Sequence, residues 1–171
     1  MNTRFRLICI ALAAIALAYA VVSGYYNVCI YLLGIIGYMV WSQYREGTVF
    51  LATQAFHRQD YEKTKRLLSD IKNPDYLRKG RRNFYEFMLG NIALKEGNID
   101  EAEMHFQLAS RLPWRKDVEK GMVLINLANI NLRKKQYNRV QAYIDLALKL
   151  KLTQRQVDII EKIKNDVNTY K

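Results

Sequence analysis

Apolar and small residues recur at one fixed interval along most of this chain. The first marks of the pattern are three residue pairs, each 38 positions from the next: Leu51-Ala52, Leu89-Gly90 and Leu127-Ala128. A small or polar residue follows each pair at the same offset, namely Ala55, Ala93 and Asn131. A second cluster then follows in each copy: Thr64, Leu68 and Ile71; Ala102, Phe106 and Ala109; Val140, Ile144 and Ala147. Such a period is typical of stacked helix-turn-helix units, none of which buries its apolar face alone.

Within each copy the apolar spacing is helical, which predicts paired helices. The expected ranges are 46–58 with 61–71, 81–96 with 99–111, 117–135 with 138–150, and a last helix over 154–169. Asp60, Asn98 and Thr153 are the expected N-caps, and Asn98 with Glu101 has the spacing of a capping box. The predicted fold is all-α, an α-solenoid of about three helix pairs over 45–80, 81–116 and 117–152 with a capping helix over 153–170.

The middle copy resembles the tetratricopeptide repeat (TPR) family in its small-residue framework. The matching positions are Leu89-Gly90, Ala93, Ala102, Phe106, Ala109 and Pro113, and the resemblance covers roughly residues 45–150. The family period is about 34 residues. We therefore expect the additional residues in the connections between copies, at Asn73-Pro74-Asp75 and Leu112-Pro113-Trp114, because proline bounds helices.

A different pattern occupies residues 1–44, where no charged residue lies between Arg6 and Arg45. The turn-like run from Ser23 to Asn27 divides this stretch into two apolar spans, about 5–22 and 28–44. Each is close to the lower length limit of about 17 residues for crossing a bilayer. The pattern predicts a transmembrane hairpin ahead of a repeat domain over 45–171. A secretory signal peptide ending near Ala20 is the alternative interpretation of the first span.

The basic residues that flank the spans predict the orientation of this hairpin. Arg4 and Arg6 precede the first span, Arg45 follows the second, and the connecting turn is uncharged. Because lysine and arginine are in excess on cytoplasmic flanks, we expect both termini and the repeat domain in the cytoplasm. The compact layout favours a bacterial inner membrane.

Charge adds a possible surface for binding anions. The chain has 27 Lys and Arg against 16 Asp and Glu, a net charge of +11. The candidate basic surface comprises Arg78, Lys79, Arg81, Arg82, Arg133, Lys134 and Lys135. A solvated or lipid-facing surface is its favoured interpretation, ahead of an acidic protein partner, and nucleic acid is the least favoured.

Catalytic chemistry has no candidate in this sequence. His57 and His105 lack a cysteine or carboxylate at motif spacing, and both cysteines, Cys9 and Cys29, lie in the apolar spans. The acidic cluster Asp100, Glu101 and Glu103 opens a helix, where negative charge complements the helix dipole. We therefore expect no enzyme activity, no cofactor and no metal site.

The TPR resemblance implies instead that the first helix of each pair lines a partner-binding groove. The residues it places there are Phe84, Phe87, Asn91 and Leu94 in the second copy, Met122, Ile125, Asn126, Asn129 and Arg133 in the third, and Val49, Thr53 and Phe56 in the first. Asn91 and Asn126 match asparagines that hold a C-terminal carboxylate in chaperone-binding relatives. Phe87 replaces the lysine that those relatives carry, which favours an extended or helical peptide with apolar anchors.

These observations predict a membrane-anchored adaptor that binds a protein or peptide partner at the cytoplasmic membrane surface. Two alternatives remain from the sequence. The chain is an accessory or assembly subunit of a larger membrane complex, or its basic surface itself binds anionic lipid or nucleic acid.

Overall fold

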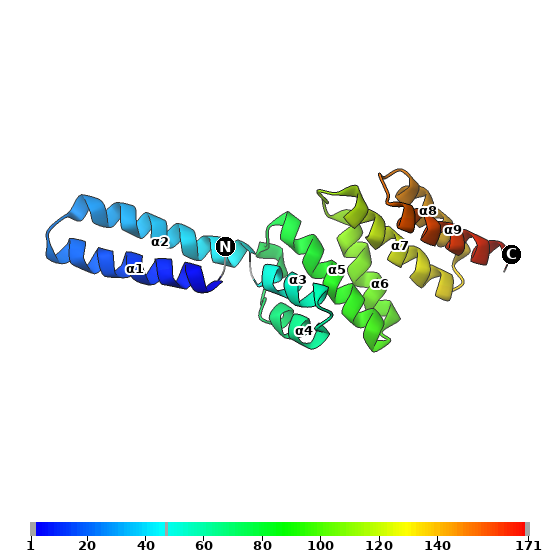
Figure 1. Ribbon diagram of the computed structural model, residues 1–171, viewed down its shortest axis with the longest axis horizontal. Coiled ribbons are helices and arrows are strands. Elements are labelled where there is room, and N and C mark those ends of the chain that lie inside the picture. The colour runs from blue at the N-terminus through cyan, green and yellow to red at the C-terminus, as the bar shows by residue number, and fades with distance from the viewer. Residues whose placement is uncertain (1–2, 47, 170–171) are drawn as a thin grey trace. The chain divides into compact units, whose positions relative to one another are not determined.

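A computed structural model describes residues 3–46 and 48–169, without the side chains of residues 3–10, 26, 39–40, 42–46 and 169. Every regular element in the described residues is helical, which confirms the all-α prediction. The chain forms two compact units, residues 1–47 and 48–171. Each unit is considered separately below (Figure 1).

The first unit is a helical hairpin of α1 (Thr3–Val22) and α2 (Tyr26–Glu46). Gly24 makes the turn with a φ of 75°, a left-handed conformation that glycine adopts without steric cost. Where the helices meet, Ala20 and Cys29 are buried, and Leu17, Leu32 and Ile36 are partly buried. This seam is narrow, so most of the apolar side chains described in the hairpin remain exposed.

Among the described residues, no helix has the length and hydropathy needed to cross a bilayer. The two predicted spans, 5–22 and 28–44, are helical. Their prediction as membrane spans gains no support from the described residues. Part of both spans lies outside the described side chains, namely residues 5–10 in the first and 39–40 and 42–44 in the second.

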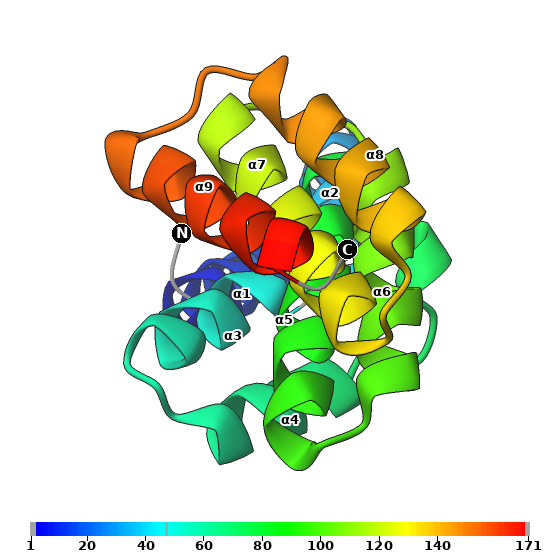
Figure 2. The same ribbon diagram turned by 90° about the vertical axis from the view of Figure 1, so that its right-hand side faces the viewer.

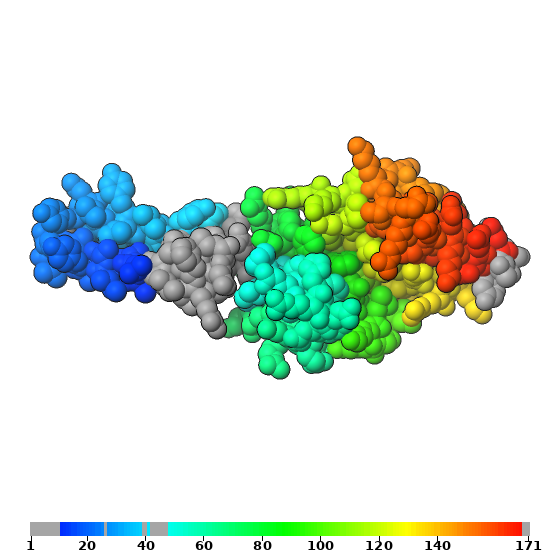
Figure 3. Space-filling model, in the orientation of Figure 1, coloured from blue at the N-terminus to red at the C-terminus, as the bar shows by residue number. Residues whose placement is uncertain are grey.

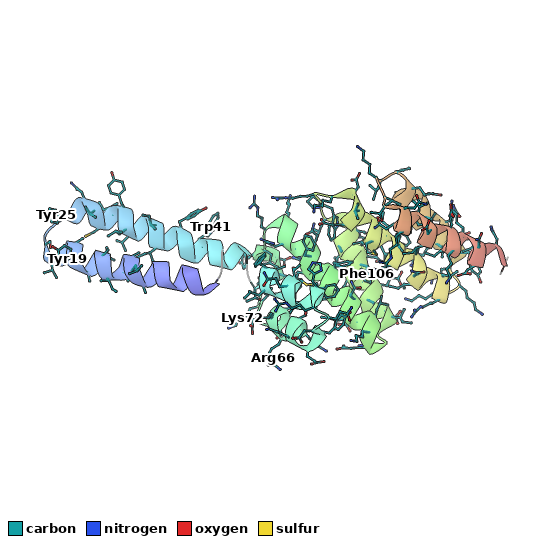
Figure 4. All side chains as sticks on the ribbon, viewed as in Figure 1. Tyr19, Tyr25, Trp41, Arg66, Lys72 and Phe106 are labelled. Atoms are coloured by element: carbon teal, nitrogen blue, oxygen red, sulfur yellow. The ribbon has the colours of Figure 1, made fainter. Side chains whose placement is uncertain are left out.

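Aromatic residues lie toward both ends of the hairpin. Tyr19 and Tyr25 are at the turn, and Trp41 is toward the other end of α2 (Figure 4). All three are exposed. Tyr38 packs against Trp41 with ring centroids 6.1 Å apart.

The second unit is a succession of antiparallel helix pairs in sequence order, which runs from left to right in Figure 1. These are α3 (Val49–His57) with α4 (Tyr61–Ser69), α5 (Lys79–Glu96) with α6 (Ile99–Arg111), and α7 (Asp117–Arg133) with α8 (Tyr137–Leu148). The short 3-10 helix η1 (Pro74–Tyr76) precedes α5, and α9 (Gln154–Thr169) packs on α7 and α8. Seen along its length, the unit is a solenoid-like stack (Figure 2).

The helix bounds follow the predicted ranges closely, with one notable difference. We expected the first helix to run over 46–58, but α2 continues to Glu46 and α3 begins only at Val49. The connections between pairs are longer than the turns within pairs, as the prolines predicted. They span residues 70–78 and 112–116, against two or three residues within a pair.

Small residues allow the two helices of each pair to approach closely. A Cβ added to Gly90 would lie 3.0 Å from the ring of Phe106, which is itself fully buried. The equivalent positions in the other copies, Ala52 and Ala128, are 0% and 1% exposed, and their partner residues Leu68 and Ile144 are equally buried. The 38-residue pattern is thus the pattern of contacts within pairs, and the space-filling view shows the pairs in tight succession (Figure 3).

A left-handed residue ends the first helix of every pair, again at 38-residue intervals. Gln59, Gly97 and Lys135 have φ values of 61°, 85° and 57°. In each case the backbone N–H of the next residue donates to a backbone carbonyl of the preceding helix. These bonds run from Asp60 to Ala55 at 3.0 Å, from Asn98 to Ala93 at 2.8 Å and from Gln136 to Asn131 at 2.9 Å. This is the hydrogen bond of a Schellman motif. The same backbone turn therefore reverses the chain in all three pairs, although only one copy uses glycine.

The predicted helix caps had different outcomes. Asp60 caps α4 as expected, since its Oδ1 accepts from the Lys63 amide at 3.1 Å. The capping-box prediction for Asn98 is wrong, because its side chain makes no cap hydrogen bond and instead donates to Glu101 Oε2 at 3.4 Å. At α9 the Thr153 backbone N–H donates to Gln156 Oε1 at 3.1 Å. The side chain of Gln156, the third residue of the helix, thus satisfies a backbone donor that has no partner within the helix.

The left-handed turns yield a stability prediction. Lys135 is exposed and pays the steric cost of a left-handed backbone. We expect Lys135→Gly to raise the free energy of unfolding by roughly 0.5–1 kcal/mol, and Gly97→Ala to lower it by about 1 kcal/mol. Denaturant unfolding of the full chain in detergent checks both values. A loss of stability in Lys135→Gly contradicts this account of the turn.

Candidate partner-binding surface

The predicted groove residues of α5 lie along one half-buried strip of that helix. Phe84, Phe87, Asn91 and Leu94 are all of intermediate exposure. The Asn91 side chain is engaged locally, because its Nδ2 donates to the Phe87 carbonyl at 2.7 Å. The apolar side chains of this strip are therefore the part that is available for a partner.

The corresponding strip on α7 is more accessible and more polar. Met122, Asn126 and Asn129 are partly exposed and Arg133 is exposed. No described residue hydrogen-bonds the side-chain amides of Asn126 and Asn129. We call these eight residues of α5 and α7 the first-helix stripe: Phe84, Phe87, Asn91, Leu94, Met122, Asn126, Asn129 and Arg133.

Three of the predicted groove residues serve packing. Ile125 is 2% exposed and lies in the core that α7 forms with α8 and α9, so it does not belong to an accessible surface. Val49 is fully buried between α3 and α5. Phe56 packs its ring against Tyr61 and Phe87. Ile125 and the next residue, Asn126, differ in exposure because neighbouring residues on a helix point about 100° apart.

Phe87 has a structural role that its sequence position alone did not indicate. Its ring centroid lies 6.0 Å from Phe56, 6.0 Å from Phe106 and 6.3 Å from Trp114. Phe84 continues the cluster to Trp114 at 5.2 Å. These edge-to-face contacts join the first two pairs to the loop before α7. Substitution of Phe87 would therefore disturb folding as well as any bound partner.

A cleft of about 400 Å³ lies elsewhere, where the turn between α3 and α4 meets the end of α5. Lys95 Nζ stands 3.7 Å from the centre of the Tyr61 ring on its wall, and Lys65 forms an ion pair with Glu96. None of the predicted groove residues lines it. It arises only because two pairs stack, so no sequence pattern marked it.

The predicted basic surface divides between two edges of the domain. Arg78, Lys79, Arg81 and Arg82 are at the start of α5, whereas Arg133, Lys134 and Lys135 are at the end of α7. Because α5 and α7 run in the same direction (Figure 1), these groups lie at opposite edges. The seven residues therefore do not form one surface.

Two members of these groups are already neutralised. Arg82 pairs with Asp75 and, over 2.8 Å, with Glu86, which is buried and accepts from His105 Nδ1 at 2.7 Å. Lys134 lies 2.5 Å from both Asp100 and Glu103. Arg81 stacks over Phe50 with its guanidinium carbon 5.7 Å from the ring centre.

Glu103 is the residue whose importance the sequence did not indicate. We assigned it to the helix dipole, yet its side chain is buried between pairs and accepts from four residues. The donors are Lys134 at 2.5 Å, Gln107 at 3.1 Å, Arg139 at 3.2 Å and Asn131 at 3.3 Å. The signal was present at Asn131, since a polar amide there breaks the Ala55 and Ala93 pattern of the other copies.

The charges around Glu103 change its pKa. Burial alone would raise the pKa of this carboxyl, but the hydrogen bond and positive charge of Lys134, with Asn131 and Arg139, outweigh burial and hold it below its ordinary value. The same contacts with Asp100 and Glu103 raise the pKa of Lys134. The pair is thus charged at neutral pH and links α6 to α7.

No protein-family model, curated protein or solved structure matches this chain. The function must therefore be argued from the surfaces described above.

The Glu103 network predicts a pH-dependent stability. Folding lowers the pKa of Glu103. The stability that its charge contributes is therefore present above the unfolded pKa of about 4.3 and is lost as the pH falls through the folded pKa. We expect Glu103→Gln to cost about 1–3 kcal/mol at neutral pH, with a difference from wild type that shrinks in acid. Urea unfolding over a pH series measures it.

Glu62→Gln is the matched control, because Glu62 is an exposed carboxylate in the first turn of α4. A constant difference between Glu103→Gln and wild type across the pH series contradicts a role for the Glu103 charge.

Proposed function

We propose that this protein is a membrane-anchored, TPR-like adaptor that binds a segment of a partner protein along the first-helix stripe. The observation that carries the proposal is the contrast between its two units. The repeat unit has continuous buried apolar clusters, whereas the hairpin leaves most of its described apolar side chains exposed. In the hairpin, exposed apolar side chains include Leu12, Ile15, Val22, Ile30, Leu33 and Ile35.

A hairpin with this surface needs an apolar environment. Val22 is 87% exposed and Ile15 is 67% exposed, on helices whose mutual contact covers only a narrow seam. Exposed apolar patches of this extent are typical of membrane or protein contact sites. Lipid chains fit a surface that is apolar on both helices and carries aromatic residues toward its ends. In sequence, residues 7–10 of the first predicted span are also apolar.

The stripe supports the binding part of the proposal. On α7 the residues Met122, Asn126, Asn129 and Arg133 follow one another at helical spacing over about 16 Å, from the rise of 1.5 Å per residue. That length corresponds to about five residues of an extended segment. Side-chain amides can both donate to and accept from a peptide backbone, while Met122 adapts to varied apolar side chains.

The partner segment is therefore extended and carries apolar anchors. Its main chain bonds to Asn126 and Asn129, and its anchors contact Met122 and the half-buried rings of Phe84 and Phe87. Arg133 at the end of the stripe favours an acidic residue in the segment. The charge distribution described above favours a cytoplasmic position for both termini and for the repeat unit.

The stripe is tested with a photo-reactive residue at Met122 in the full chain, in its native membrane. We expect crosslinks to one apolar segment of a partner, and at least roughly tenfold weaker binding of that segment as a peptide to Asn126→Ala plus Asn129→Ala, which is about 1.4 kcal/mol. Fluorescence anisotropy measures the affinity. Both asparagines are partly exposed, so the double variant should unfold like wild type.

The control position is Leu146, an exposed apolar residue on α8. Equal crosslinking from Leu146 and Met122, or unchanged peptide affinity in the double variant, contradicts binding at the stripe. Phe87→Ala is a poor test here, because it removes the centre of the aromatic cluster.

The anchor is tested with Ile15→Lys plus Ile35→Lys. Both side chains are exposed and near the middle of the predicted spans, so lysine costs little in water but about 3 kcal/mol each at the centre of a bilayer. We expect wild type to stay in the membrane pellet after alkaline extraction and the double variant to leave it. Ser23→Asp, in the turn, should behave as wild type. Retention of the lysine variant would contradict membrane insertion.

A further inference from the structure

The loops that follow the helix pairs carry an excess of unpaired positive charge. The three loops, residues 70–78, 112–116 and 149–153, contain the exposed basic residues Lys72, Arg78, Arg115, Lys116, Lys149 and Lys151. Among the described residues, none of these six takes part in an ion pair. We call them the loop rim. Their only acidic neighbours within the loops are Asp70 and Asp75, and Asp75 is already paired with Arg82.

Contacts along the chain make this rim one continuous edge. Asn83 Nδ2 at the start of α5 donates to the Pro113 carbonyl at 2.8 Å. The Lys151 amide donates to Asp117 Oδ2 at 3.1 Å, and Gln156 Nε2 donates to the Val118 carbonyl at 2.8 Å. The second loop is thus tied to the start of α5 and the third to the start of α7. The loops before α7 and α9 accordingly lie together at the top of the repeat unit in Figure 1.

These ties also hold the rim in shape. Trp114 Nε1 donates to the Ala109 carbonyl at 2.8 Å, and Leu77 is buried beside the first pair. The basic side chains therefore project from fixed backbone. Lys72 lies on the outer surface of the unit (Figure 4).

The start of α5 adds unpaired positive charge to this edge. Helix N-termini favour acidic residues, because the positive end of the dipole is there. The first turn of α5 contains none, and Arg78 and Lys79 stand at its start without an ion pair among the described residues. The first turns of α3, α8 and α9 also lack acidic residues, whereas those of α4, α6 and α7 contain them. Positive charge at a positive helix end is unfavourable for folding alone, and a bound anion reverses that.

The opposite edge has a different character. There Lys65 pairs with Glu96, Lys134 with Asp100 and Glu103, and Arg139 with Glu103. Lys95 stacks on Tyr61. Acidic residues of the domain thus neutralise much of that edge and leave the loop rim unneutralised.

We propose that the loop rim binds the anionic headgroups of a lipid bilayer, so that the repeat unit lies against the membrane by this edge. The inference rests on the anchoring part of the proposed function. The chain enters the repeat unit at Thr48, and Phe50 two residues later touches Arg81 on this edge. A tether at that point raises the local concentration of lipid headgroups over that of any free polyanion. Tyr76, 67% exposed in the first loop, suits the bilayer interface.

The test is lysine acetylation of the full chain in vesicles, with each lysine quantified by mass spectrometry. The vesicles contain phosphatidylcholine alone or with phosphatidylserine. We expect roughly fivefold slower labelling of Lys72, Lys116, Lys149 and Lys151 with phosphatidylserine, and a return to the original rate at roughly 0.5 M salt. Lys63 and Lys135, exposed on the opposite edge, should label equally in both.

A matched pair of variants separates the rim from net charge. Arg78→Glu plus Lys116→Glu should abolish the protection of Lys72, whereas Lys63→Glu plus Lys135→Glu, which changes the net charge equally, should leave it intact. Loss of protection in both variants, or in neither, overturns the assignment to the rim.

Vesicle flotation separates failure of this inference from failure of the anchor. A chain that does not float with neutral vesicles contradicts the anchor. A chain that floats with both kinds of vesicle but shows no protection contradicts the rim alone. Stronger protection by added single-stranded RNA in neutral vesicles than by phosphatidylserine would overturn the lipid assignment in favour of nucleic acid.

Discussion

The close approach of two helices within each pair is the contact on which the repeat unit depends. A first-helix residue without a large side chain faces a bulky residue of the second helix, as Gly90 faces Phe106. Ala52 and Ala128 occupy the same position in the other copies and are as deeply buried. Because interiors are close-packed, a larger residue at these positions would separate the helices and open the core between pairs. The left-handed turns at Gln59, Gly97 and Lys135 bring the helices back at the angle that this contact requires.

Contacts between pairs also use the repeated apolar positions, and residues that break the repeat add to them. The first and second pairs share the aromatic cluster around Phe87, whereas the second and third share the charges around Glu103. Removing one partner of a buried ion pair is costly because the other charge stays behind. The Glu103 network therefore fixes the register of the third pair against the second.

The distribution of surface types connects the fold with the two proposals. Stacking leaves the first-helix stripe partly open, because each first helix contacts its own pair on one side and the next pair on another. The same stacking collects the connecting loops on one edge, where their unpaired lysines and arginines add up. A partner on the stripe and a bilayer at the loop rim would use different surfaces, so both contacts are compatible in one molecule.

The sequence by itself determined the helical class, the pairing and most helix bounds, because these depend on spacing along the chain. The repeated positions of Gly90 and Phe106, and the Asp60 cap, are local signals of this kind. Only the tertiary structure decided which face of a helix a neighbour covers. It placed Ile125 in the core while Asn126 stayed accessible. It also showed that Glu103 is buried between α6 and α7, and that the basic residues lie at two opposite edges. It further showed left-handed backbone at Gln59 and Lys135, which the sequence did not predict because neither residue is glycine. These outcomes depend on residues distant in sequence, whose approach no local spacing encodes.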